Sequence, residues 1–352
     1  MSILKQHHIS SSPTLKRCKS FTFDVNQQAE SLVQWEQRYN QHSSGTFNGY
    51  LDELKLDGIH FFEEFTNRTL LQQCSINEDN LWLGFSLQQQ RPKINNQKIL
   101  AGQIMTRPSG VEFELLTPSD FSIYGLVINK ESLSKEMVGP DIELWQNQST
   151  NMQVSAPNHY VTYELAKIIN LVLNTNNSTI GNSEILDQNN LSRLTKLSPL
   201  ITSKVADLLS RTEYDYTDPK VTHLTTNLTI QKVVADITNY VKETSSYPLT
   251  ISELCKITGV GRRTLQYCFE HGFGISPIQY IRDCRLNEIR RILLNSEDKD
   301  IIIADLALDF GFYHIATFNS QYKHLFGETP SQTIKRSSGY HSVPMIKDIT
   351  KG

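Results

Sequence analysis

Two stretches near the end of the chain share one pattern. Residues 251–260 read Ile-Ser-Glu-Leu-Cys-Lys-Ile-Thr-Gly-Val, and residues 303–312 read Ile-Ala-Asp-Leu-Ala-Leu-Asp-Phe-Gly-Phe. In both, an acidic residue, a leucine and a small residue follow one another, and a glycine stands five positions after the leucine. Glycine accepts the left-handed backbone of a tight turn between two helices. The repeat therefore predicts two helix-turn-helix units.

A second helix is expected after each turn, over residues 262–270 and 314–326. Each unit then closes with a glycine and a proline three positions later, at Gly274 and Gly327. Residues 281–294 form a further helix, long enough to space two recognition helices on successive major grooves, about 34 Å apart. The side chains expected in the core of the two units are Leu265, Phe269, Phe318, Tyr322 and Phe326.

The alternative is a plain helical bundle, in which the apolar stripes serve only the core. A glycine, aromatic residues and a G-x-x-P turn recur in the same order in both units, and this repetition favours DNA binding over the alternative. With these landmarks, residues 230–336 resemble the DNA-binding domain of the AraC/XylS family, and residues 303–330 resemble that family's signature. The resemblance implies seven helices. The family often has serine where Gly261 stands and arginine where Ser320 stands.

By the same resemblance, each recognition helix offers a set of side chains to DNA. Arginine and glutamine suit the edges of guanine and adenine in the major groove. The predicted DNA-binding residues are Arg262, Arg263, Gln266 and Tyr267 in the first unit and His314, Ile315, Asn319 and Ser320 in the second. Side chains that could contact phosphate are Arg282, Arg285, Arg290, Arg291 and Lys323.

The N-terminal half has a different pattern of apolar and turn residues. Residues 28–40 place Leu32, Trp35 and Tyr39 at three- and four-residue steps, which predicts a helix. From residue 45 to about residue 129, seven short apolar-aromatic runs alternate with turn residues, which predicts an antiparallel sandwich or small barrel. Helical patterns return at 161–174 and 197–211. Residues up to about 20 are expected to be poorly ordered.

The predicted fold class is therefore α+β and multidomain. A β-rich effector-sensing domain is expected over residues 1–145 and a helical connector with its linker over 146–220. A tandem helix-turn-helix domain is expected over 221–340, followed by a tail over 341–352. Residues 221–352 carry 15 Lys and Arg against 13 Asp and Glu, whereas the rest of the chain carries 19 against 24. This mild bias favours the C-terminal part as the one that meets phosphate.

Enzymatic activity is not expected. A cupin-type metal site needs clustered histidines and a carboxylate, and the β region offers only His60, with His42 before it. No G-x-S-x-G, Walker or dinucleotide motif is present, so no catalytic or metal-binding residue is assigned. The five cysteines are odd in number and form no C-x-x-C pair, and no apolar run is long enough to span a bilayer. We therefore expect a cytoplasmic protein with reduced cysteines and no membrane partner.

The β region resembles, more narrowly, the EutR-type regulators of ethanolamine-utilisation operons. The resemblance rests on Trp35–Tyr39, Gly45–Gly49, Cys74, Trp82–Phe85, Thr106–Leu115 and Thr117–Pro118, and it continues through Gly311–Phe312 and His314 to the absence of arginine at 320. It implies an activator that responds to ethanolamine together with adenosylcobalamin, which would act as an effector rather than a fixed cofactor.

The residues themselves leave the effector open. Glu112 and Glu114 alternate with Phe113 and could hold an ammonium, with Arg107 close to them in the same strand, but a salt bridge or a solvated face explains them better. Trp82 could line a pocket or belong to the core. The predicted partners are promoter DNA, RNA polymerase and a small-molecule effector, and a homodimer stays open. The alternative function is a regulator whose β domain serves dimerisation or partner docking without a ligand.

Overall fold

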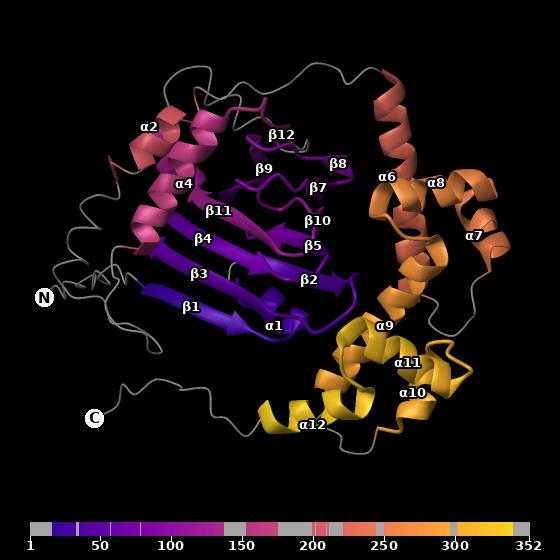
Figure 1. Cartoon of the computed structure of the whole chain (residues 1–352). Coiled ribbons are helices and arrows are strands. Elements are labelled where there is room, and N and C mark those ends of the chain that lie inside the picture. The colour runs from indigo at the N-terminus through magenta and orange to yellow at the C-terminus, as the bar shows by residue number, and fades with distance from the viewer. Residues whose placement is uncertain are drawn as a thin grey trace, which may run out of the picture.

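The computed structural model describes residues 16–32, 35–56, 58–77, 79–136, 153–174, 199–200, 202–208, 210, 221–243, 250–295 and 301–340. Two antiparallel sheets make up the N-terminal part, helices cover the outer face of one sheet, and a helical C-terminal part lies beside the other sheet (Figure 1). The predicted fold class is confirmed. The linker predicted at 212–220 lies outside the described residues.

The first sheet has seven strands among the described residues, and every neighbouring pair is antiparallel. Its order is β1 (Lys16–Thr22), β3 (Gly49–Leu56), β4 (Ile59–Thr66), β11 (Phe121–Asn129), β6 (Asn80–Phe85), β9 (Met105–Pro108) and β12 (Gln153–Val154). Both faces of the central strands are apolar, because one face meets helices and the other meets the second sheet.

The second sheet faces the first. Among the described residues it has five strands, in the order β2 (Trp35–Gln41), β5 (Leu70–Ile76), β10 (Phe113–Thr117), β7 (Lys93–Ile94) and β8 (Gln97–Lys98). The side chains between the sheets form an aromatic core that includes Trp35, Tyr39, Phe62, Trp82 and Phe113. All seven runs predicted as strands are strands, namely β3, β4, β5, β6, β9, β10 and β11.

The helix predicted over residues 28–40 is wrong. The chain forms α1 (Val25–Glu30) and then enters β2 at Trp35. Trp35 and Tyr39 lie four positions apart, a spacing that fits a helix but also puts both on one face of a strand, and both are buried between the sheets. The start of the chain also differs from the expectation, because β1 begins at Lys16 and pairs with β3 along its whole length.

Among the described residues, three helical segments lie between β11 and the C-terminal domain in sequence: α2 (Lys130–Glu136), α4 (His159–Asn174) and the helical residues 202–208. Apolar residues of α4 and of 202–208 pack with β3, β4, β6 and β11 in one core cluster. These helices cover the face of the first sheet that does not meet the second sheet (Figure 1).

The C-terminal part contains seven helices between residues 221 and 340 of the described structure, as the family resemblance implied. They are α6 (Val221–Glu243), α7 (Ile251–Thr258), α8 (Arg262–Phe273), α9 (Pro277–Asn295), α10 (Ile303–Asp309), α11 (Ile315–Phe326) and α12 (Pro330–Tyr340). They form two apolar clusters, one around α6, α7 and α8 and one around α10, α11 and α12, and α9 contributes to both. The predicted core residues Leu265, Phe269, Phe318, Tyr322 and Phe326 are all buried.

A carboxyl group is buried between the two sheets. Glu64 on β4 is 4% exposed, and its carboxyl accepts hydrogen bonds from the Gln28 side-chain amide at 2.9 Å and the Tyr39 hydroxyl at 3.1 Å. Burial raises the pKa of Glu64 to about 7, although these two hydrogen bonds lower it in part. The protonated form is therefore populated near neutral pH.

Replacing Glu64→Gln should make the protein less sensitive to pH. Between pH 4.5, the ordinary pKa of glutamate, and pH 7, folded Glu64 keeps a proton that the unfolded chain releases, so the free energy of unfolding falls as pH rises. The variant lacks this loss and should gain up to about 3 kcal/mol over the wild type between pH 4.5 and 7. Urea denaturation at both pH values measures the difference. A difference independent of pH would contradict the raised pKa.

Candidate nucleic-acid interface

The first helix-turn-helix unit is α7 and α8. Thr250 and Glu253 form a capping box at the start of α7, in which each side chain bonds the other residue's backbone N–H. Gly259 ends α7 with a φ of 68°, the left-handed conformation that the sequence predicted for the turn. Two residues, Val260 and Gly261, separate this glycine from the start of α8 at Arg262.

The second unit is α10 and α11. Gly311, the counterpart of Gly259, has a φ of 78°, and α11 begins at Ile315. Both units end alike, because Pro277 and Pro330 each open the following helix at a position where the missing N–H costs nothing. The internal repeat in the sequence is therefore a repeat of structure.

The predicted contact residues of α8 lie on its outer face. Arg262 and Arg263 are exposed, and Tyr267 is 48% exposed with its ring stacked on His271. Gln266 is half-buried, and its side-chain amide donates to Glu270 at 2.7 Å. The opposite face of α8 carries Leu265 and Phe269 into the core, so the polar residues are left to solvent.

The second recognition helix has a less charged face. His314, Ile315, Asn319, Ser320 and Lys323 are all exposed, with Ile315 at 43%. Ser320 cannot make the bidentate contact of an arginine, whereas Asn319 can pair with adenine and Ile315 can pack on a thymine methyl. This unit can therefore recognise bases with one amide, one apolar side chain and a histidine.

A family model described as a helix-turn-helix domain matches residues 254–336, from within α7 into α12. An activator of Pseudomonas putida named "XylDLEGF operon transcriptional activator 2" is 31% identical over 98 residues, which cover 28% of this chain and 62% of the relative. The C-terminal domain is similar to the helix-turn-helix domains of the AraC/XylS family, and residues 221–340 are called the AraC/XylS domain below. These matches support a DNA-binding regulator rather than an enzyme for the part of the chain that they cover.

Two further similarities extend beyond this domain. A Rhodococcus erythropolis protein named "Probable thc operon regulatory protein" is 26% identical over 148 residues, which cover 40% of this chain and 42% of that protein. The crystal structure of the AraC-like transcriptional activator CuxR covers 83% of this chain at 16% identity and a TM-score of 0.38. The match spans less than two thirds of the length of the Rhodococcus and the Pseudomonas relatives.

Three of the arginines predicted to contact phosphate are instead buried or bonded inside the protein. Arg285 and Arg290 are buried, at 6% and 4% exposure, because both lie on faces of α9 that pack inside the molecule. The Arg291 guanidinium donates to the Tyr39 carbonyl at 2.7 Å and also contacts Asn40. Arg282 is half-buried and Lys323 of the AraC/XylS domain is exposed, so these two stay available.

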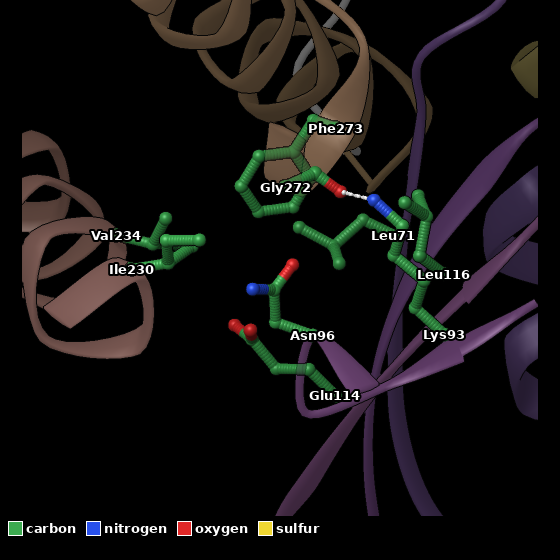
Figure 2. Close-up of a pocket in the computed structure, with 9 residues that line it drawn as sticks. All are labelled: Leu71, Lys93, Asn96, Glu114, Leu116, Ile230, Val234, Gly272 and Phe273. Atoms are coloured by element: carbon green, nitrogen blue, oxygen red, sulfur yellow. Dashed lines mark hydrogen bonds between the residues drawn. The ribbon is translucent and has the colours of Figure 1, made fainter. Parts of the chain in front are cut away.

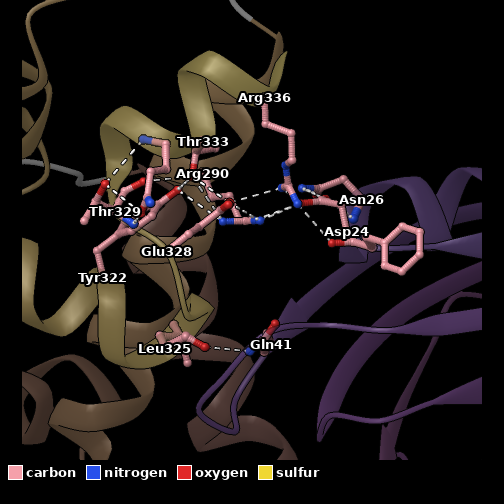
Figure 3. Close-up of polar contacts among 12 residues, drawn as sticks. Asp24, Asn26, Gln41, Arg290, Tyr322, Leu325, Glu328, Thr329, Thr333 and Arg336 are labelled. Carbon is pink, nitrogen blue, oxygen red and sulfur yellow. Dashed lines mark hydrogen bonds and ion pairs between the residues drawn. The ribbon is translucent and has the colours of Figure 1, made fainter. Parts of the chain in front are cut away.

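The buried arginine on α9 joins the AraC/XylS domain to the β-rich part. Arg290 donates through Nε to Asp24 at 2.9 Å, and its terminal nitrogen lies 2.8 Å from both Asp24 and Glu328. Arg336 on α12 makes a second ion pair with Asp24, also at 2.8 Å (Figure 3). Burial alone would lower the pKa of Arg290, but the charges of Asp24 and Glu328 outweigh it and raise the pKa.

Neutral hydrogen bonds extend this contact along β2. The Gln41 side chain donates to the Leu325 carbonyl at 2.6 Å, at the end of α11 (Figure 3). The Gln41 backbone N–H donates to the Asn287 side chain at 3.0 Å, and that side chain donates back to the Gln41 carbonyl at 3.0 Å. The second helix-turn-helix unit is therefore held by specific polar contacts.

The first unit meets the β-rich part through apolar side chains and through Lys93. Leu71 of β5 and Leu116 of β10 pack in the core cluster of α6 and α8, beside a cavity of about 20 Å³ (Figure 2). The Lys93 ammonium donates to the Gly272 carbonyl at 2.5 Å across this cavity. Burial lowers the pKa of Lys93 to about 8, with Lys98 contributing in the same direction.

The predicted effector residues do not share one site. Arg107 lies on β9 in the first sheet, whereas Glu114 lies on β10 in the second sheet and Glu112 just before it, so the prediction of one strand is wrong. Trp82 and Arg107 are each 2% exposed between the sheets. Glu112 and Glu114 instead line a polar groove with Glu36 of β2 and residues of α6.

Within the described residues, no three His, Cys, Asp or Glu side chains are placed to hold a metal ion, and no helix is long and apolar enough to cross a membrane. All five cysteines are free, and Cys18 is exposed on β1. Sequence reasoning missed Asp24, Gln41 and Asn287. The available signal was Arg290, which lies four positions after Leu286 and three before Leu293, on the apolar face of its helix.

Replacing Arg290→Ala should lower the free energy of unfolding by about 3–5 kcal/mol, because it leaves the buried carboxylate of Asp24 and the half-buried one of Glu328 with one guanidinium in place of two. The control is Lys323→Ala on exposed surface, which should change stability by no more than about 0.5 kcal/mol. Urea denaturation followed by circular dichroism measures both. Equal, small effects would show that the ion network contributes nothing to stability.

Proposed function

We propose that the chain is a cytoplasmic, sequence-specific DNA-binding transcription regulator whose β-rich part senses a small molecule. The observation that carries the proposal is the repeated helix-turn-helix build, with two recognition helices that each bury one face and expose polar side chains. Both relatives named above are regulators of operons by their printed names. The name of the Pseudomonas relative supports activation at a promoter, where the regulator would meet RNA polymerase.

The roles of the contact residues follow from their chemistry. Arg263 and Arg262 would contact guanine edges or phosphate, and Gln266 would contact adenine after releasing Glu270. On the second helix, Asn319 and His314 would contact bases and Lys323 a phosphate. The two arginines make the first helix the stronger contributor, since Ser320 offers only a hydroxyl.

The DNA-binding claim is tested with the double variant Arg263→Ala/Gln266→Ala. Fluorescence anisotropy against DNA upstream of the gene and of the neighbouring operon should show specific binding by the wild type. The variant should lose at least about 30-fold in affinity, because two base contacts are removed. The control is Lys335→Ala, exposed on α12, which should bind as the wild type does. If the wild type does not distinguish this DNA from a shuffled sequence, the proposal is overturned.

The effector implied by the EutR-type resemblance is tested in the same titration. Ethanolamine, adenosylcobalamin and both together are added, and the resemblance predicts that the pair changes the affinity for specific DNA by about fivefold or more. The groove at Glu36, Glu112 and Glu114 supplies the carboxylates that an ammonium needs, so Glu112→Gln/Glu114→Gln should abolish this response. If the affinity for specific DNA does not change with any effector, a β-rich part that serves dimerisation or docking is favoured.

A further inference from the structure

A guanidinium without a counter-charge lies in the interior of the β-rich part. Arg107 stands on β9 directly opposite Trp82 of β6 and is 2% exposed. Among the residues that the structure describes, no carboxylate forms an ion pair with it, and its Nε has no acceptor. Burial lowers the pKa of Arg107 to about 10, so the side chain is still charged at neutral pH. Buried charges in proteins are paired as a rule.

Two further buried donors lie in the same cluster. The indole nitrogens of Trp35 and Trp82 have no acceptor within the described part of the chain. The Trp35 and Trp82 rings are 5.6 Å apart, and Trp82 stacks on Phe113 at 5.1 Å. The Arg107 guanidinium lies 5.6 Å from the centre of the Phe113 ring. All three unsatisfied groups are N–H donors, so what the cluster lacks is an acceptor with negative charge.

We propose that this cluster binds the carboxylate of a small organic acid, with Arg107 as the counter-charge and the indole N–H groups of Trp35 and Trp82 as further donors. The inference rests on the proposed function, because it names the chemical class of ligand that the sensing part takes. It concerns the interior between the sheets and not the acidic groove at Glu36, Glu112 and Glu114.

The surroundings favour a carboxylate over other ligands. A planar guanidinium matches a carboxylate with two parallel hydrogen bonds, and its single positive charge balances a single negative one. The other side chains of the cluster are apolar, including Phe62, Ile123 and Met105, and would contact the hydrocarbon body of an acid. An ammonium such as that of ethanolamine would be repelled by Arg107. A phosphate would bring more negative charge than one arginine balances.

Strand β10 connects this cluster to the AraC/XylS domain. Phe113 and Leu115 point between the sheets, whereas Glu114 and Leu116 point outward, as alternate residues of a strand must. Leu116 packs in the core cluster of α6 and α8. A ligand that displaces Phe113 therefore acts on the strand against which the first helix-turn-helix unit rests.

The test is thermal unfolding of the full chain with hexanoate and phenylacetate. Hexanamide and inorganic phosphate are the comparison compounds, since hexanamide has the same carbon chain as hexanoate without the charge. At least one of the two carboxylates should raise the melting temperature by about 5 °C at saturation, and the comparison compounds should not. No shift with either carboxylate, or an equal shift with hexanamide or with phosphate, would overturn the proposal.

The variant Arg107→Met separates a ligand-binding arginine from a structural one. Without ligand, the variant should melt at the same or a higher temperature, because methionine fills similar space and removes an unpaired buried charge. Its affinity for the active carboxylate should fall at least about 30-fold. A lower melting temperature without ligand, or an unchanged affinity, would show that Arg107 supports the fold instead. Arg68→Met, at a surface loop, is the control and should keep the response to the carboxylate.

Tryptophan fluorescence gives an independent readout of the site. Two of the three tryptophans in the chain lie in the cluster, so Trp145→Phe leaves only Trp35 and Trp82 to report. The carboxylate should change this emission in the Trp145→Phe protein and should not when Arg107→Met is added. Specific DNA binding is measured separately on the same proteins. Wild-type protein that binds specific DNA but no carboxylate would overturn this inference alone, and loss of specific binding would overturn the proposed function.

Discussion

The buried ion pair between Asp24 and Arg290 is the contact on which the arrangement of the molecule depends. Asp24 is 2% exposed and accepts from two arginines of the AraC/XylS domain, so neither partner can be removed without leaving charge in the interior. Arg290 lies on α9, which contributes to the cores of both helix-turn-helix units. A contact that fixes α9 therefore constrains the position of both recognition helices relative to the β-rich part.

The two units are attached to the β-rich part by different chemistry. The second unit is held by ion pairs and hydrogen bonds to Asp24 and Gln41, whereas the first rests mainly on Leu71 and Leu116, with the Lys93 ammonium bonded to the Gly272 carbonyl of α8. Charged contacts require specific geometry, and apolar contacts tolerate sliding. The first unit is therefore the one whose position can respond to changes inside the sheets. Its recognition helix also carries Arg262 and Arg263, so a small shift there would alter the stronger of the two DNA contacts.

Local patterns in the sequence predicted much of the fold, but they did not predict contacts between residues that are distant in sequence. The glycines at 259 and 311 and the seven apolar runs are local signals, and each became the turn or strand that was predicted. The spacing of Trp35 and Tyr39 fits both helix and strand, and only pairing with β5 decides between them. Asp24 and Arg290 are 266 residues apart, so no local pattern joins them. The sequence predicted Arg107 and Glu114 to be neighbours on one strand, but the two residues lie in different sheets.

The central claim is that two helix-turn-helix units of one chain contact DNA together. Hydroxyl-radical footprinting of the full chain on its specific fragment tests this most directly. The account predicts two protected patches on one face of the duplex, with centres about 10 base pairs apart, since adjacent major grooves on one face are one turn apart. The patch under α8 should be protected more strongly than the patch under α11. A single patch, or two patches on opposite faces of the duplex, would contradict it.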